Sequence, residues 1–344
     1  MEGMSKPVQQ HYLPRGAYLT FFEDTGRPGF IWLYQRGREP VLSNMEKVAK
    51  ERHLYSFVEK DGKMNTSLEK DLAELENQTR PILAKLNSGP ATVELTAAEE
   101  FVLAWFVACQ AVRTPAQRRV MQDLIGGMLP PDVESEHLRD YALAGNYRVE
   151  AHTKFGMIIA LEAAKEIVTT FLMKRLLVLR SAEVNFLTCD HPILRLTDPK
   201  APVWFRGGFL MAPVFFPIGS RAALVWMHDR KKTPPRSPGE RILVPSKVLP
   251  AAKVRQYTKG IISNAEDYLF ACEKNPFIRK LFDKTKRPER FELHNPFETR
   301  QDMWEKIPPG PPVPCEDGVT RAPGTGRDQT NWFYDPERPG PETV

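Results

Sequence analysis

The spacing of apolar residues changes twice along the chain, and these changes restrict the possible folds more than any other feature. In residues 1–58, apolar and aromatic runs at 17–22 and 30–34 flank a turn-forming segment, which is typical of a β-hairpin. From residue 65 to residue 170 the apolar side chains recur every three or four positions, as on one face of a helix. Strand-like runs return over residues 173–275. The sequence therefore predicts a block of helices inserted between two β-rich segments.

Capping and breaking residues predict where these helices begin and end. The first helix carries one apolar stripe, and Pro81 within it predicts a bend or a break. Thr96 and Glu99 match a capping box in front of a second, strongly apolar helix. A third long helix is expected over residues 150–170.

The β-rich regions are predicted from short apolar runs between turn-forming residues. Residues 175–179 and 185–188 flank a hairpin-sized gap and predict a second hairpin. A terminal helix is expected over residues 254–268. Weaker patterns predict several further elements: a short helix at 43–52 capped by Ser43 or Asn44, strands at 55–58, 210–216 and 222–227, and a basic loop at 229–240.

These elements fit a single α+β domain over residues 1–283. Its mixed sheet would be built from the N-terminal β segment (1–58) and the C-terminal segment (173–275, ending in a helix), with the helical block (65–170) packed against it. Residues 284–344 are rich in proline and lack periodic apolar spacing, which predicts a mostly disordered tail. Aromatic residues in such a disordered tail could dock on a partner protein. The alternative to disorder is an irregular arm that packs on its own domain.

Composition excludes several classes of protein. With 344 residues and 42% hydrophobic residues the chain can bury a large core, yet no window has the roughly 18 uninterrupted apolar residues of a membrane span. The N-terminus lacks the apolar segment of a signal peptide, and the four cysteines lie far apart without a zinc-site spacing. We therefore expect a cytoplasmic protein without a membrane partner. The net charge of +5 favours anionic partners slightly, either a small molecule or nucleic acid.

Two short polar runs carry most of the candidate site residues, and the first lies where the chain enters a strand: Gln10-His11-Tyr12-Leu13-Pro14-Arg15. An imidazole titrates near neutral pH, so His11 is a candidate general base or metal ligand. Tyr12 and Arg15 are candidates for binding an anionic ligand. The alternative is a buried histidine whose ring nitrogens bond backbone carbonyls at the strand entry.

The second run follows an apolar strand: Thr188-Cys189-Asp190-His191-Pro192. Side chains on a tight loop at a strand end commonly point into a site. Asp190 is therefore a candidate catalytic carboxylate that binds a metal or orients His11, and His191 is a candidate ligand-binding residue. The alternative is a turn in which the Asp190 oxygens accept backbone amides. The first interpretation requires that His11 and Asp190 lie close together in the fold.

Glu76 and Arg113 are charged residues on predicted helices. A carboxylate near an apolar stripe is costly to bury unless it is paired, which makes Glu76 a third catalytic candidate. A surface pair with Arg80, four residues further on, explains Glu76 equally well. Arg113 ends an apolar helix, where it could stabilise the helix C-terminus or clamp a carboxylate or phosphate.

Several of these runs together resemble an uncharacterised bacterial family that is known only as a domain of unknown function. Its members begin with a Gln-His-Tyr-x-Pro motif, as residues 10–14 do. They carry a central Ser-Asp-Asn-Pro motif, which this chain matches with Cys189 and His191 in place of Ser and Asn. The resemblance covers residues 9–274 and includes an Arg-Thr-Pro element that begins at Arg113. It implies the location of a site and no particular reaction, and the two exchanges imply that any family chemistry is altered here.

These residues are compatible with two functions. The first is a hydrolase that acts on a phosphoester of a nucleic acid or nucleotide, and a divalent metal, Mg or Mn, suits the available donors. Its site would comprise a base, two carboxylates and two phosphate clamps: His11, Asp190, Glu76, Arg15 and Arg113. The second is a non-catalytic or regulatory module that binds an anionic ligand, in a bacterial defence or stress system. A purely structural role for both motifs is the remaining alternative.

Overall fold

The computed structural model describes residues 9–52, 54, 57–58, 64–115, 117–118, 164–196, 209, 212–229, 237–288, 313–314 and 320–321. By its internal contacts the chain forms two units, Met1–Glu292 and Leu293–Val344. The first unit carries both motifs. In the second, the structure describes two short antiparallel strands, β15 (Val313–Pro314) and β16 (Thr320–Arg321). The predicted tail therefore lies almost entirely outside the described residues.

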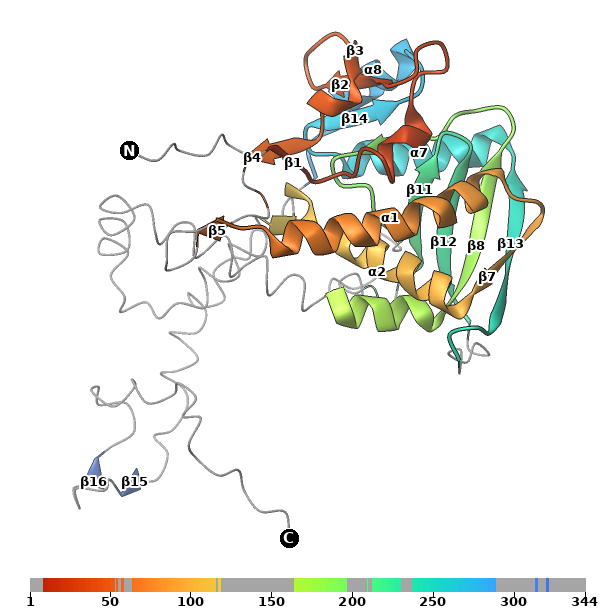
Figure 1. The fold of residues 1–344 in the computed structure, drawn as a ribbon. Helices are drawn as coiled ribbons and strands as arrows, with labels where there is room; N and C mark the ends of the chain where they lie inside the picture. Colours follow the sequence, from red (N-terminus) through yellow and green to blue (C-terminus); the bar gives the residue numbers. More distant parts are fainter. Residues whose placement is uncertain are drawn as a thin grey trace. The chain divides into compact units, whose positions relative to one another are not determined.

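A six-stranded mixed sheet forms the centre of the first unit (Figure 1). Its strand order is β10-β11-β12-β8-β13-β7, in which β13 and β8 are parallel and the other neighbours are antiparallel. Its central strands are apolar on both faces, as expected for strands covered by helices on both sides. The strands are β7 (Thr92–Thr96), β8 (Lys174–Ser181), β10 (Leu194–Arg195), β11 (Val214–Gly219), β12 (Ala222–His228) and β13 (Arg241–Leu249).

A second, four-stranded antiparallel sheet joins the two ends of the first unit in the order β3-β2-β14-β9. Its N-terminal strands pair with a C-terminal strand, which confirms that N- and C-terminal segments share a sheet and that the fold is α+β. Its strands are β2 (Phe30–Gln35), β3 (Val41–Asn44), β9 (Thr188–Cys189) and β14 (Tyr268–Ala271). Two smaller pairs are β1 (Gln9–His11) with β4 (Lys50–Arg52) and β5 (Phe57–Val58) with β6 (Met64–Asn65).

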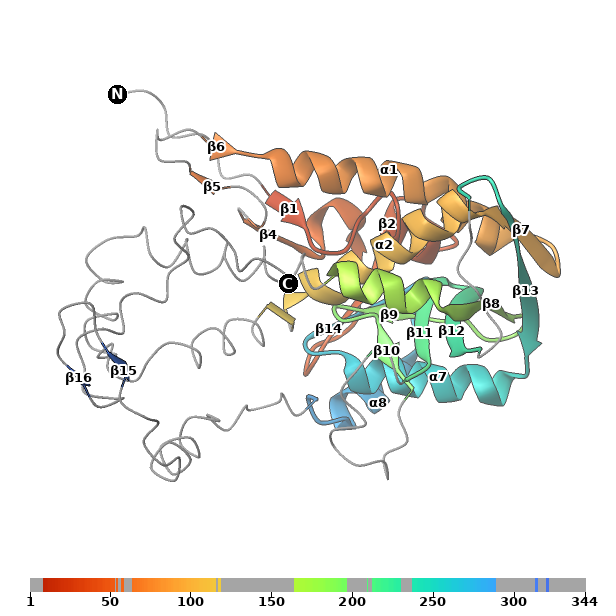
Figure 2. The same ribbon diagram turned by 90° about the horizontal axis from the view of Figure 1, so that it is seen from below.

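Helices cover both faces of the mixed sheet (Figure 2). On one face lie α1 (Ser67–Ser88), α2 (Ala97–Arg113) and the helical residues 164–172, whose apolar side chains form one continuous core with the sheet. On the other face lies α7 (Ala251–Asn264), which packs with α8 (Pro276–Lys284) on a separate core. The α7 contact with the sheet includes stacking of Tyr257 on Phe215, with ring centroids 4.5 Å apart.

The long helices form largely as their sequence patterns predict. The capping box is confirmed, because the Thr96 hydroxyl accepts from the Glu99 N–H and the Glu99 carboxylate accepts from the Thr96 N–H. Pro81 lies within α1 and does not end it. A proline removes one helical hydrogen bond, and the stripe of buried side chains on both sides of it compensates for that loss.

Two N-terminal predictions were wrong. Residues 17–22 form the 3-10 turn η1 (Leu19–Phe22) in place of a strand, because the N–H groups of Tyr18 and Leu19 bond the Pro14 carbonyl and turn both side chains into the core. Residues 43–52 form β3, a short 3-10 turn and β4 in place of a helix. Asn44 does act as a cap, but of that 3-10 turn.

The C-terminal half also differs from its prediction. The hairpin of 175–179 with 185–188 does not form, because β8 pairs with β12 and β13 whereas β9 pairs with β14. The strands at 210–216 and 222–227 correspond to β11 and β12. β7, β13 and α8 were not predicted, because their apolar residues find partners that are distant in the sequence.

Candidate functional site

Asp190 lies directly after β9 and holds the turn between α7 and β14. Its Oδ1 accepts a hydrogen bond from the Glu266 N–H at 2.9 Å, and its Oδ2 accepts from the N–H groups of Asp267 at 2.7 Å and Tyr268 at 3.0 Å. The residue is only 4% exposed. A buried carboxylate that accepts three amides has little capacity left for a metal ion or a proton in transit. This geometry favours a structural role for Asp190 over a catalytic one. The turn that it stabilises is the α7–β14 turn, which is distant in the sequence, and not the turn in which Asp190 itself lies.

Tyr12 lies close to Asp190 although the two are far apart in the sequence. Burial raises the pKa of the Tyr12 hydroxyl well above its ordinary value, and the negative charge of Asp190 raises it further. The Tyr12 backbone is fixed at both ends, since its N–H donates to the Ala49 carbonyl at 2.9 Å and its carbonyl accepts from Gln110 Nε2 at 3.2 Å. Tyr12 therefore stays protonated at neutral pH and ties the first motif to α2.

Glu76 and Arg113 form an ion pair that joins α1 to α2. Arg113 Nη1 donates to Glu76 Oε1 at 2.9 Å, and Arg113 Nε donates to the Gln110 side-chain carbonyl. The Arg113 side chain is 1% exposed and that of Glu76 is 26% exposed. Glu76 is thus paired with Arg113 and not with Arg80, so the surface-pair interpretation is wrong. Because the guanidinium already binds a carboxylate, an added anion would have to compete with Glu76 for it.

His191 is fixed at the end of α2. Its Nδ1 lies 2.8 Å from Oγ1 of Thr114, the C-cap residue of α2, and its backbone carbonyl accepts from Asn264 Nδ2 at 2.6 Å. Burial lowers the pKa of His191 to about 4, and the positive charge of Arg195 contributes to the same shift. The imidazole is therefore neutral at pH 7.

These contacts form one connected group, which we call the motif cluster. It links the N-terminal segment, α1, α2, the end of β9 and the α7–β14 turn. It contains five of the seven candidate site residues together with Gln110, which the sequence analysis did not select: Tyr12, Glu76, Gln110, Arg113, Asp190 and His191. Because these polar groups bond one another or the backbone, the cluster fixes the elements around it.

His11 precedes Tyr12 at the end of an extended strand, where adjacent side chains point to opposite sides. Burial lowers the pKa of His11, the charges of Lys50 and Arg15 lower it further, and a hydrogen bond with the Met45 backbone opposes the shift. The negative charge of Glu46 also opposes the shift, so the His11 ring lies among charges of both signs. Asp190, in contrast, acts on the Tyr12 side of this motif.

Arg15 lines an open pocket beside the first motif. The pocket has a cavity volume of about 290 Å³, and its polar walls include Arg15, Glu23, Asn44 and Glu46. Arg15 forms an ion pair with Glu46 at its wall. In the described part of the chain, no three His, Cys, Asp or Glu side chains lie close enough together to hold a metal ion. A Mg or Mn ion, which the donor types in the sequence would suit, therefore has no such ligand set among these residues.

Tyr34 of β2 and Arg36, directly after β2, position the loops around a second pocket. The Tyr34 hydroxyl donates to the Glu273 carbonyl at 3.0 Å and accepts from the Asn275 N–H at 2.6 Å. The Arg36 guanidinium lies 4.1 Å from the centre of the Phe282 ring. It donates to carbonyls of the α7–β14 turn and of the C-terminal end of α8: Ala265, Glu266, Phe282 and Thr285. N-terminal residues thus hold α8 and the β14–α8 loop in place.

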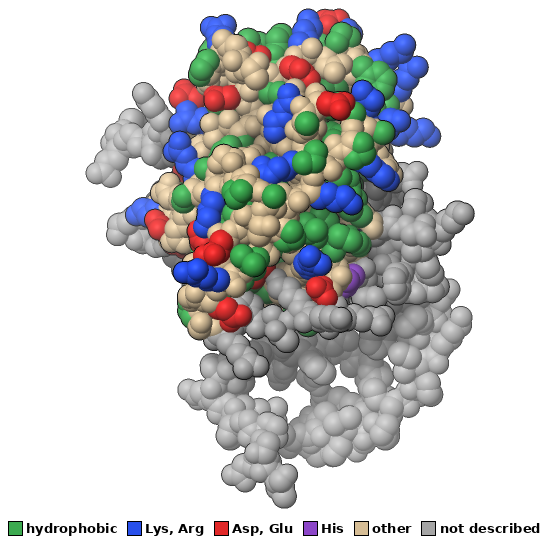
Figure 3. Space-filling view, turned by 90° about the vertical axis from the view of Figure 1, so that its right-hand side faces the viewer, with side chains coloured by type: hydrophobic (Ala, Val, Ile, Leu, Met, Phe, Trp, Pro, Cys, Tyr) green, Lys and Arg blue, Asp and Glu red, His purple; other side chains and the backbone are tan. Residues whose placement is uncertain are grey.

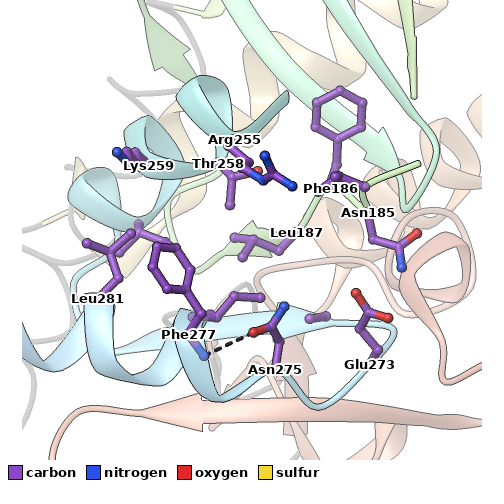
Figure 4. A pocket seen from close by; sticks show the side chains of 14 residues that line it. Asn185, Phe186, Leu187, Arg255, Thr258, Lys259, Glu273, Asn275, Phe277 and Leu281 are labelled. Atoms are coloured by element: carbon purple, nitrogen blue, oxygen red, sulfur yellow. Dashed lines mark hydrogen bonds between the residues drawn. The ribbon is translucent and has the colours of Figure 1, made fainter. Parts of the chain in front are cut away.

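The second pocket, which we call the α7–α8 pocket, lies between these two helices, β14 and the segment before β9 (Figure 4). Its cavity volume is about 80 Å³, and it is partly open to solvent. This volume is smaller than that of most small-molecule sites, roughly 300–1,000 Å³, so a ligand would lie partly in the open mouth of the pocket. Its walls are largely apolar and aromatic: Val184, Phe186, Leu187, Ile262, Ala271, Phe277, Ile278 and Leu281.

The α7 wall of this pocket presents polar groups without partners among the described residues. Arg255 and Lys259 lie four positions apart on α7, both are exposed, and neither forms an ion pair in that part of the chain. The hydroxyl oxygen of Thr258, between them, is buried and has no hydrogen-bond partner there. Figure 4 shows the Arg255 guanidinium pointing across the pocket toward the segment that carries Asn185 and Phe186.

Sequence analysis missed this pocket because its walls come from four separate segments. One signal was present: Arg255 and Lys259 repel each other on adjacent turns of a helix, which is slightly unfavourable unless an anion compensates. The structure adds a second indication, because Phe277 is a large aromatic side chain that is 59% exposed. Neither indication is specific by itself.

A comparison with known families matches residues 9–275 to the model described as "Protein of unknown function (DUF4238)". The chain belongs to this family. The match confirms the resemblance inferred from the two motifs, and it assigns no activity. No curated protein and no solved structure matches the chain. The matched region ends before Phe277, Ile278 and Leu281, so the α8 wall of the pocket lies beyond it.

Among the described residues, no helix is both long enough and apolar enough to cross a bilayer.

Proposed function

We propose that this protein is a binding module that holds a small organic anion in the α7–α8 pocket. The observation that supports the proposal is the combination of an apolar pocket with two cations, Arg255 and Lys259, that have no carboxylate partner in the described part of the chain. An anion placed beside α7 would pair with both, and its apolar part would be removed from water by the walls. The Thr258 hydroxyl, buried without a partner there, would gain a hydrogen bond.

In this proposal the motif cluster positions the pocket and does not contact the ligand. Asp190 fixes the turn that connects α7 to β14, and Arg36 fixes that turn to α8. These three elements form most of the pocket wall. Sites of this kind depend on supporting residues that hold the binding groups in place.

The proposal predicts stabilisation by apolar anions and not by their neutral counterparts. Phenyl phosphate and 3-phenylpropanoate should raise the melting temperature of the native chain, because ligands that bind only the folded state stabilise it. The neutral 3-phenylpropanamide should not. In the Arg255→Ala/Lys259→Ala variant the shift with both anions should disappear, as measured by differential scanning fluorimetry and calorimetric titration.

The matched control is Arg175→Ala, which removes an exposed arginine of β8 that does not line the pocket. This variant should bind the anions as the native chain does. Equal binding by the native chain and the double variant, or no stabilisation of the native chain by either anion, would contradict the proposal.

One face of the molecule gives no support to nucleic-acid binding. On the side of the molecule seen in Figure 3, Lys and Arg side chains are interspersed with acidic and hydrophobic ones. A nucleic-acid interface usually carries a continuous basic stripe that follows the phosphates. The described residues on that side present no such stripe.

A second candidate function is phosphoester hydrolysis by His11, which lies near the pocket that Arg15 lines without lining it itself, and the lowered pKa of His11 favours this function. A histidine with a pKa below 6.5 is largely neutral at pH 7 and can accept a proton from water or a hydroxyl. Lys50 and Arg15 would attract the phosphate, although Glu46 already pairs with Arg15. In this candidate function Asp190 takes no part in the reaction.

Hydrolysis by His11 predicts a particular pH profile. Because the pKa of His11 is lowered, its reactive neutral form persists to a more acidic pH than that of an unperturbed imidazole. The rate of p-nitrophenyl phosphate hydrolysis should therefore fall only at a correspondingly lower pH. His11→Gln should lower the turnover rate about 100-fold or more, as is typical for loss of a general base. A chain without turnover, or a variant as active as the native chain, would leave only the binding proposal.

A further inference from the structure

We infer that the ligand of the α7–α8 pocket carries a hydrogen-bond-donating group, an amine or a hydroxyl, at the end opposite its anionic group. This inference rests on the proposed function and names the class of ligand: an organic acid with an apolar middle and a polar far end. It follows from how the pocket distributes its polar side chains.

The anion-binding groups are confined to one wall. Arg255, Thr258 and Lys259 all belong to α7, and Figure 4 shows them on one side of the pocket. The same view places Asn185, Glu273 and Asn275 together on the other side. These three residues come from the segment before β9 and from the β14–α8 loop.

The far wall is rich in hydrogen-bond acceptors. Glu273 is exposed, and its carboxylate forms no ion pair or hydrogen bond with the described residues. The Asn185 side chain also has no partner among them. Asn275 is different, because its Oδ1 accepts the Phe277 N–H at 3.0 Å and only its amide N–H groups remain available. The wall therefore offers a negative charge and an amide carbonyl to a ligand donor.

Apolar side chains separate the two polar walls. Leu187, Ile262 and Ile278 line the pocket, and Figure 4 shows Leu187 between the α7 wall and the loop wall. A simple anion such as inorganic phosphate would occupy only the α7 wall. A purely apolar acid would leave Glu273 without a partner, and its own charge would be repelled by that carboxylate.

A ligand with an amine at its far end satisfies both walls. Its acidic group pairs with Arg255 and Lys259, its apolar middle covers the floor, and its ammonium pairs with Glu273. A hydroxyl at the same place would donate to Glu273 or Asn185 with a smaller gain, since only one partner would then be charged. Glu273 thus acts as the residue that selects among organic anions.

Calorimetric titration with a matched pair of ligands tests this inference. The pair is 3-phenylpropanoate and its counterpart with an aminomethyl group at the para position. The native chain should bind the aminomethyl compound about tenfold more tightly, a difference of about 1.4 kcal/mol. Glu273→Gln should abolish this preference while binding of the plain acid is retained or improved. Glu166→Gln, at an exposed helical position outside the pocket, should keep the preference.

The outcomes separate this inference from the proposed function. If both compounds bind the native chain equally and Glu273→Gln changes nothing, the far-end donor is wrong and anion binding stands. If neither compound binds, and Arg255→Ala/Lys259→Ala behaves as the native chain does, the proposed function itself is wrong.

Discussion

Replacing Asp190 by alanine is expected to lower the free energy of unfolding by about 3–5 kcal/mol, because three backbone amides would lose a charged acceptor inside the protein. These amides belong to Glu266, Asp267 and Tyr268, at 2.9, 2.7 and 3.0 Å from the carboxylate oxygens. The loss would also release the α7–β14 turn and weaken ligand binding in the α7–α8 pocket. Urea denaturation followed by circular dichroism measures the effect.

Two further variants make this prediction specific. Asp190→Asn keeps the shape of the side chain but turns an amide N–H₂ group toward some of the backbone donors, so it should lose much of the same stability. Asp71→Ala removes an exposed carboxylate of α1 and should change stability by less than about 0.5 kcal/mol. If Asp190→Ala is as stable as the native chain, Asp190 does not hold the turn and its catalytic interpretation regains support.

Replacing Arg113 by methionine is expected to have the second largest effect on the free energy of unfolding. It should cost about 2–4 kcal/mol of unfolding free energy, because breaking a buried ion pair leaves an uncompensated charge. Arg113 is 1% exposed and Glu76 is 26% exposed, so water relieves part of the cost at the Glu76 end. The methionine side chain fills much of the volume that the arginine stem occupies. The measurement is again the midpoint and slope of urea denaturation.

A double-mutant cycle distinguishes a structural pair from a ligand clamp. Arg113→Met/Glu76→Met should recover part of the stability lost in Arg113→Met, because both charges are then removed together. Arg80→Met, an exposed position one turn from Glu76, should be nearly neutral. A stable Arg113→Met variant that has lost ligand binding would instead show that the guanidinium serves a ligand.

The candidate site illustrates what residue types in a sequence can predict. Glu76 was selected because a carboxylate near an apolar stripe must have a partner, and it has one. Asp190 was selected because it lies on a tight loop at the end of a strand, and it binds three backbone amides there. The identity of the partners was not predictable. Glu76 pairs across to α2 instead of with Arg80 on its own helix, since packing of α1 against α2 brings Arg113 closer to it.

The fold shows the same division. The capping box at Thr96 and the strands β11 and β12 depend on neighbouring residues, and these features were predicted. β9 was expected to form a hairpin with β8, because strands that follow each other in the sequence are usually neighbours. It pairs instead with β14, about 80 residues further along the chain. Its two residues carry too little pattern to specify a partner.

The sequence by itself determined the α+β class, the family and the places where polar residues need partners, because periodicity, capping and motif order are local properties of the chain. Only the tertiary structure decided that Asp190 serves a distant turn and that Arg255, Lys259 and Glu273 face one pocket. These arrangements arise when segments from both ends of the domain pack together. Their geometry depends on burial and on non-local pairing, and neither quantity is encoded in any single stretch of residues.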